Sequence, residues 1–227
     1  MTFPSSGGGL MVEAVAARRI SRRHTGVNLA LGTLAGFTLV QLGLRLWVRG
    51  SPRPIPYGWA WLLENPWRRR YRDPVPLADA CALRPTDHVL EVGCGSGLFT
   101  PALAGRCGHL TALDIEARYL AQTAAKIAGL PNVTLLHGDL SALPCEAGSL
   151  DAVILISVLT ELPAPIAALR ECVRVLRPGG RIIVGEEFFG PEYVRACTVD
   201  AWAGAARLRR VDRLGNGWAY LHTYALG

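Results

Sequence analysis

The sequence predicts an α/β fold, built as a doubly wound, seven-stranded, mostly parallel sheet with a C-terminal antiparallel hairpin and preceded by an N-terminal hydrophobic helix. Three observations predict it. Apolar runs of strand length alternate with helical patterns from residue 83 onward. The chain closes on two extended runs around Gly215-Asn216-Gly217, which is a hairpin signal. An uncharged apolar segment lies near the N-terminus.

These patterns divide the chain into four segments. We expect a flexible basic N-terminus over 1–26, within which Met11 is an alternative start, and a transmembrane or membrane-interfacial helix over 27–48. An aromatic, arginine-rich linker or lid follows over 49–75, and the α/β domain occupies 76–227.

The stretch 27–44, "VNLALGTLAGFTLVQLGL", carries no charge. As a helix it spans roughly 27 Å, which approaches a hydrocarbon core of about 30 Å. Its polar residues, such as Asn28 and Gln41, leave a buried or interfacial helix as the alternative. We expect membrane attachment through residues 27–72, with the α/β domain facing the cytoplasm, since more arginines follow the segment than precede it.

Residues 51–74 gather Trp59, Trp61 and Trp67 beside an arginine cluster. Aromatic and arginine side chains favour a membrane interface, but the same residues suit a helix that caps the core domain. A lid over a pocket that opens toward the bilayer satisfies both interpretations.

The charge is divided unevenly along the chain. Residues 1–73 hold eleven arginines against three acidic residues, a net charge of +8, whereas the rest of the chain has a net charge of −2. A nucleic-acid partner is disfavoured, because the body that would hold the site is not basic. The six cysteines lack metal-ligand spacing, so we expect no metal site and reduced thiols.

The α/β domain is expected to alternate strand and helix in order. The expected strands are 88–93, 110–114, 132–138, 149–157 and 181–189, and the expected helices are 98–107, 116–129, 164–176 and 191–206. Gly129 and Pro131 end the second helix, and "RPGG" ends the third. The unbroken apolar run 149–157 is typical of a strand that is covered on both faces.

The turn "GCGSG" after the first strand places Gly93, Gly95 and Gly97 where a doubly wound sheet binds its ligand. Glycines let the backbone turn sharply and approach a ligand closely. Asp114 ends the second strand about twenty residues later, where a carboxylate accepts both hydroxyls of a ribose. NAD is disfavoured as the ligand, because Leu98 stands where the dinucleotide motif requires a small residue.

At this point the sequence resembles the class I S-adenosylmethionine-dependent methyltransferases, in the branch of ubiquinone- and menaquinone-biosynthesis enzymes that act on small molecules. The resemblance covers about residues 76–190 and rests on "LEVGCGSGLFT", "LTALDIE", "LLHGDLSALPCEAGSLDAVI", "ILISVLTEL" and "ECVRVLRPGGRIIVGEE" in that order. It implies S-adenosyl-L-methionine as the cofactor. The implied cofactor-binding residues are Glu91, Gly93, Cys94, Gly95, Gly97, Asp114, Ile115, Asp139, Leu140 and Ser157.

The implied activity is methyl transfer to a small, hydrophobic or membrane-associated acceptor. No residue must be a general base; His137, Glu186 and Glu187 are candidates near the expected site, and Cys94 is expected to pack. Two alternatives stay open: a catalytically inactive membrane module that binds the same cofactor, and an NAD-dependent reductase. The acceptor atom and the oligomeric state are not specified by the sequence.

Overall fold

The computed structural model describes Leu39, Gly43, Arg70, 72–187 and 193–227. The predicted basic N-terminus and nearly all of the predicted membrane segment and lid therefore lie outside the described residues. The chain forms two compact units, Met1–Trp47 and Val48–Gly227. Within the described residues, no helix combines the length and apolar character that crossing a bilayer requires.

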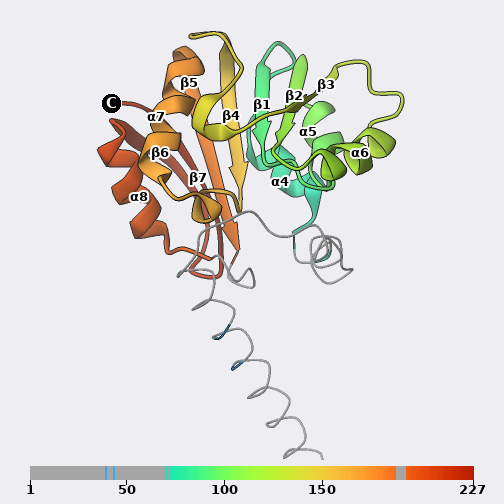
Figure 1. Cartoon of the computed structure of the whole chain (residues 1–227). Helices are drawn as coiled ribbons and strands as arrows, with labels where there is room; N and C mark the ends of the chain where they lie inside the picture. The colour runs from blue at the N-terminus through green and yellow to red at the C-terminus, as the bar shows by residue number, and fades with distance from the viewer. Residues whose placement is uncertain (1–38, 40–42, 44–69, 71, 188–192) are drawn as a thin grey trace, which may run out of the picture. The chain divides into compact units, whose positions relative to one another are not determined.

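A seven-stranded sheet organises the second unit (Figure 1). Its strands are β1 (His88–Val92), β2 (His109–Asp114), β3 (Val133–His137), β4 (Leu150–Ile156), β5 (Leu176–Glu187), β6 (Leu208–Gly215) and β7 (Ala219–Leu226). They are arranged in the order β3-β2-β1-β4-β5-β7-β6. The first five strands are parallel, and β7 is antiparallel to both β5 and β6. The predicted fold class of the domain is confirmed.

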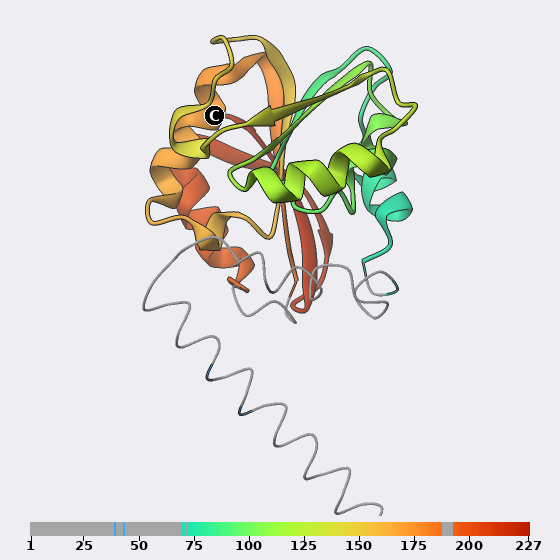
Figure 2. The same cartoon turned by 45° about the vertical axis from the view of Figure 1, so that its right-hand side comes forward.

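Helices cover both faces of this sheet because its central strands are apolar on both sides (Figure 2). One core cluster joins the sheet to α7 (Pro165–Val175) and α8 (Ala196–Ala205). A second cluster joins it to α4 (Pro74–Ala80) and α5 (Thr100–Ala104). A smaller cluster packs α6 (Ala117–Lys126) near β2 and β3.

Several elements begin or end elsewhere than the sequence patterns predict. Strand β5 starts at Leu176, so "RPGG" is part of an irregular first section of the strand rather than a turn after the helix. Helix α5 has only five residues, with no side-chain cap at its start. Two short 3₁₀ turns, η2 (Leu140–Ala142) and η3 (Leu159–Glu161), follow β3 and β4. None of these differences changes the carboxyl ends of β1 and β2, where the sequence predicts the site.

Candidate functional site

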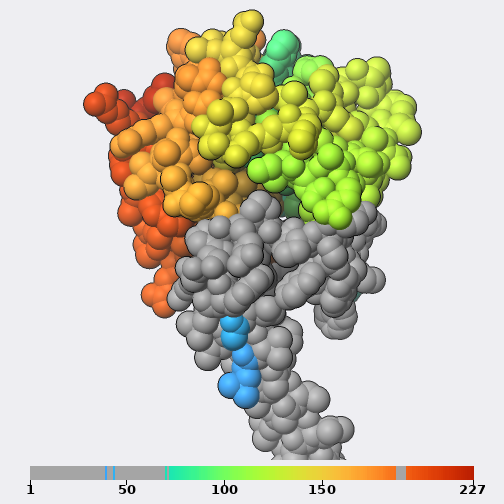
Figure 3. All heavy atoms as spheres, viewed as in Figure 1, coloured from blue at the N-terminus to red at the C-terminus, as the bar shows by residue number. Residues whose placement is uncertain are grey.

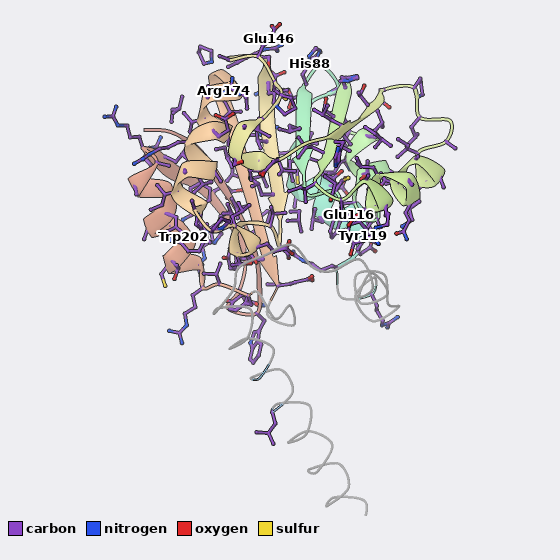
Figure 4. The ribbon with its side chains drawn as sticks, viewed as in Figure 1. His88, Glu116, Tyr119, Glu146, Arg174 and Trp202 are labelled. Carbon is purple, nitrogen blue, oxygen red and sulfur yellow. The ribbon has the colours of Figure 1, made fainter. Side chains whose placement is uncertain are left out.

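The glycine turn lies at the point where the winding of the sheet reverses. Strands β2 and β3 lie on one side of β1, and β4 and β5 lie on the other. Loops therefore diverge at the carboxyl ends of β1 and β4, which is where open α/β sheets bind ligands. Figure 4 shows Glu116, just after β2, at the opposite end of the sheet from His88 and Glu146. The predicted position of the site is thus the end that bears Glu116.

The turn requires glycine for reasons visible in its geometry. Gly93, Gly95 and Gly97 have φ angles of 67°, 54° and 77°, a region that side chains disfavour. A Cβ on Gly97 would lie 2.8 Å from Oγ1 of Thr123, and one on Gly93 would lie 2.6 Å from a methyl of Val158. The loop is therefore packed tightly between α6 and the segment that follows β4.

Gly95 is held from both sides. Its N–H donates to Oδ2 of Asp114 at 2.7 Å, and its carbonyl accepts from the hydroxyl of Thr123 at 2.9 Å. The other carboxylate oxygen of Asp114 accepts from the N–H of Glu116 at 2.8 Å. Burial raises the pKa of Asp114, while these backbone donors act in the opposite direction. Each oxygen keeps a second lone pair, which suits a ribose hydroxyl donor.

Glu91 is an acidic group in an apolar environment on β1, directly before the turn. Its side chain is 3 % exposed, and its Oε2 has no hydrogen-bond partner among the described residues. Burial raises its pKa to about 8, with a smaller contribution from the charge of Asp114. The raised pKa favours the protonated form of Glu91, and a nearby cation would favour the ionised form.

Cys94 and Ile115, two further residues of the predicted set, differ in exposure. Cys94 is 5 % exposed and packs with Ala112 and Leu120, and burial raises the pKa of its thiol. It therefore packs rather than reacts, as expected. Ile115 is 48 % exposed at the carboxyl end of β2, which leaves an apolar surface available to a nucleobase.

The residues after β3 have partners within the protein. The ring of His137 lies 3.0 Å from the carbonyl of Ile115, and the Asp139 carboxylate accepts from the N–H of Ser141 as the cap of η2. Leu140 is 4 % exposed and packs in the core, so its side chain does not face solvent. Asp139 stays exposed beside it.

Ser157 ends β4 in a strained conformation, with a φ of 56°. Its N–H donates to the carbonyl of Gly185, and its hydroxyl is buried without a hydrogen-bond partner among the described residues. The following residue, Val158, covers Gly93. The structure therefore brings the segment that contains Ser157 next to the glycine turn.

Two buried acids lie at the carboxyl end of β5. Glu186 is 1 % exposed and Glu187 is 5 % exposed. Glu187 forms an ion pair with Arg72 at 3.4 Å, and Gly185 provides the space, since a Cβ there would lie 3.2 Å from the guanidinium. Sequence reasoning missed this role of Arg72. In the sequence, the only sign of this role is the position of the arginine just before the proline-rich start of α4.

These residues fit an S-adenosylmethionine molecule. The three glycines present no side chain to a ligand, and Cys94 and Ser96 between them are buried. Glu91 offers a carboxyl for an ammonium group, and Asp114 offers acceptors for a ribose. Exposed Ile115 provides the apolar contact for a base. All four features occur on β1, β2 and the loops that follow them.

Comparison with known proteins identifies the domain. Residues 90–184 match the family model described as a methyltransferase domain. The chain is 35% identical over 120 residues to demethylmenaquinone methyltransferase of Staphylococcus aureus, an alignment that covers 52% of this chain and 47% of the relative. It is 36% identical over 113 residues to an uncharacterized 37.1 kDa transposon protein of Streptomyces fradiae, covering 48% and 33%. The chain thus spans less than half the length of these curated relatives.

Solved structures share the fold. A SAM-dependent methyltransferase from Aquifex aeolicus superposes with a TM-score of 0.69 at 20% identity, over 75% of this chain and 98% of that one. The [4+2]-cyclase SpnF superposes with a TM-score of 0.55 at 25% identity, over 61% and 59%. The matched family favours S-adenosylmethionine over NAD as the cofactor. Residues 90–184 thus form a methyltransferase domain of the class I S-adenosylmethionine-dependent type.

Proposed function

We propose that this protein transfers the methyl group of S-adenosylmethionine to a small, hydrophobic acceptor associated with a membrane. The observation that carries the proposal is the glycine turn, whose central residue Gly95 is fixed between Asp114 and Thr123 at the switch point of the sheet. A relative that shares 35% identity is named for demethylmenaquinone, which supports a small-molecule acceptor.

The reaction requires the protein to align the acceptor with the methyl group of the cofactor. The bound cofactor supplies an activated methyl group, and the acceptor attacks it in line. Holding two reactants in that geometry contributes about 7–11 kcal/mol toward the barrier. Asp114 and Glu91 would fix the ribose and ammonium ends, and Ile115 would exclude water from the base.

A general base for the acceptor is a separate question. Glu187 is already paired with Arg72, so its charge is used within the protein. Glu186 lies beside it, opposite Tyr220 in β7. We propose that Glu186, rather than Glu187, acts as the general base for the acceptor. Glu187 then belongs to the structure that supports Glu186.

We propose further that residues 27–72 attach the protein to the membrane, with the methyltransferase domain on the cytoplasmic side. The support is the uncharged stretch 27–44 and the arginine-rich sequence around it. The rest of the chain, residues 74–227, has a net charge of −2, so the excess positive charge lies in the N-terminal third.

The test uses the full chain, cofactor labelled in its methyl group and a membrane extract. We expect the label to enter the organic phase. Label found only in protein or RNA would refute a lipid-like acceptor, and label in the aqueous small-molecule fraction would replace it with a polar one.

A second candidate is a domain that binds the cofactor without methyl transfer. A [4+2]-cyclase shares the fold of this domain, so the fold alone does not establish methyl transfer, and this observation supports the second candidate. Measuring calorimetric affinity for S-adenosylmethionine together with turnover separates the two: tight binding without turnover on any extract supports the second candidate.

A further inference from the structure

The β6–β7 hairpin displays exposed apolar side chains at the edge of the sheet. Val211, Leu214, Trp218 and Leu226 are 47 %, 42 %, 58 % and 44 % exposed, and they are four of the seven exposed large hydrophobic residues in the described part of the chain. Strand β6 is the outermost strand of the sheet. The red C-terminal part of the chain forms the outer border in Figure 3. Leu214 and Trp218 flank the tip of the hairpin, whereas Leu226 pairs with Leu208 at its other end. Exposed apolar side chains at one place on a surface favour an interaction site, and here that place is the tip.

The tip of this hairpin is held in a fixed shape. The side-chain oxygen of Asn216 accepts from the N–H groups of Trp218 and Ala219 at 2.8 and 3.2 Å. The hydroxyl of Tyr193 donates to the carbonyl of Gly217 at 2.8 Å. Leu214 and Trp218 are therefore presented outward by an ordered turn.

Positive charge accompanies the apolar side chains. The hairpin residues 207–218 contain four arginines and one aspartate, a net charge of +3, whereas the rest of 74–227 has a net charge of −5. Arg210 is paired with Asp200. Arg213 lies at the tip, is exposed and forms no ion pair with the described residues. Arg207 and Arg209 are also exposed, but they lie at the start of β6, away from the tip.

The tip lies at the functional end of the sheet. Ala219, next to the tip, is opposite Glu187, the last residue of β5. The carboxyl end of β5 is also the end at which the glycine turn follows β1, since β1, β4 and β5 are parallel. A surface that contacts the tip would therefore lie on the side where an acceptor enters.

We propose that the tip of the hairpin, residues 213–218, docks on an anionic lipid surface, with Leu214 and Trp218 in the headgroup region and Arg213 against the lipid phosphates. Arginine and tryptophan together favour that interface. Pairing of two β6 edges would bring arginines of two copies together, which opposes a second copy as the occupant. The inference rests on the proposed membrane-associated function and adds a contact from the catalytic domain itself.

The first experiment locates the contact on the full chain with an environment-sensitive fluorophore. Cys145→Ser and Cys197→Ser remove the two cysteines that are not buried, and single cysteines are introduced by Leu214→Cys, Trp218→Cys or Glu146→Cys. Glu146 lies at the opposite end of the sheet and is the matched control (Figure 4). On vesicles containing phosphatidylserine, the labels at 214 and 218 should shift to the blue, and the label at 146 should not.

The second experiment tests the charge. Arg213→Glu should weaken binding to these vesicles by roughly fivefold or more, because each arginine near an anionic surface contributes about that factor. Arg84→Glu, in the turn before β1, is the control and should change it little. The effect of Arg213→Glu should shrink as salt is added.

Three results would overturn the proposal. The first is that the labels at 214 and 218 do not shift although the protein binds vesicles, which would mean that another segment makes the contact. The second is that they shift without vesicles as the protein concentration rises, which would indicate a second copy of the chain. The third is that they shift when nucleic acid is added and not when vesicles are added. Calorimetric affinity for S-adenosylmethionine, measured on the same preparations, reports separately on the proposed function. Loss of the lipid contact with intact cofactor binding refutes only this inference.

Discussion

Gly97 shows at the residue scale why the turn is built from glycine. Its φ of 77° and the 2.8 Å separation from Thr123 exclude even a methyl group without movement of α6. Sequence reasoning placed Gly93, Gly95 and Gly97 in the turn after β1, where the structure has them, because glycine spacing after a strand is a local signal. Their part in binding the cofactor stays a prediction. Sequence reasoning did not find Thr123, since a threonine in a helix carries no sign of which loop it will contact.

We predict that Gly97→Ala lowers both stability and cofactor affinity. The positive φ costs about 1–2 kcal/mol for a residue with a side chain, and the clash adds to it. Affinity should fall by tenfold or more, as measured by calorimetry, with a lower Tm. Gly105→Ala is the control, because that residue has an ordinary helical φ of −68° and a Cβ would meet nothing closer than 3.7 Å. Equal effects of the two changes would contradict this account.

Glu91 should make stability depend on pH. The pKa is raised from 4.5 to about 8 in the folded protein, so the folded state keeps a proton that the unfolded chain releases. The free energy of unfolding should therefore fall as pH rises from about 4.5 to about 8. Glu91→Gln, which stays neutral, should flatten this dependence in denaturant titrations between pH 5 and 8. An unchanged slope would show that Glu91 is ionised throughout.

The Arg72–Glu187 ion pair joins, at the scale of elements, the residues before α4 to the end of β5. Both side chains are largely buried, at 8 % and 6 % exposed, so removal of one partner takes away an opposite charge that lies beside a buried group. We predict that Arg72→Met or Glu187→Gln alone costs about 3–5 kcal/mol. The double variant should lose less than the sum of the two, as a double-mutant cycle in urea would measure. Additive losses would show that the pair is not coupled.

The strands were more predictable than the boundaries between them. The apolar runs that form β1, β2 and β4 are short and clearly bounded, so their ranges were predicted within one or two residues. Strand β5 begins early because Leu176 pairs with Leu150 before the irregularity. That pairing is a tertiary contact, which no local pattern encodes. No helix was expected over α4, whose first residues fall in the expected lid. Its signal is tertiary as well, because Leu77 and Ala78 are buried only since the sheet lies against them.

The cofactor-site residues belong, at the scale of the whole molecule, to one compact unit. Val48–Gly227 contains every residue proposed to bind the cofactor, and Met1–Trp47 forms the other unit. We predict that deletion of residues 1–47 preserves affinity for S-adenosylmethionine within a factor of about two, while a smaller share of the protein is recovered in the membrane fraction. Fractionation and calorimetry check the two halves. Lost affinity would show that the first unit is part of the cofactor site.

The fixed position of Gly95 has a consequence for how fast the cofactor arrives. The peptide is anchored to β2 and α6 before any nucleoside is present, so no slow ordering step should precede association. Stopped-flow mixing should give a single phase whose rate rises linearly with concentration. Thr123→Val, which removes one anchor and keeps the shape, should introduce a second phase that saturates. A saturating phase already present in the unaltered protein would mean that the turn rearranges during each encounter.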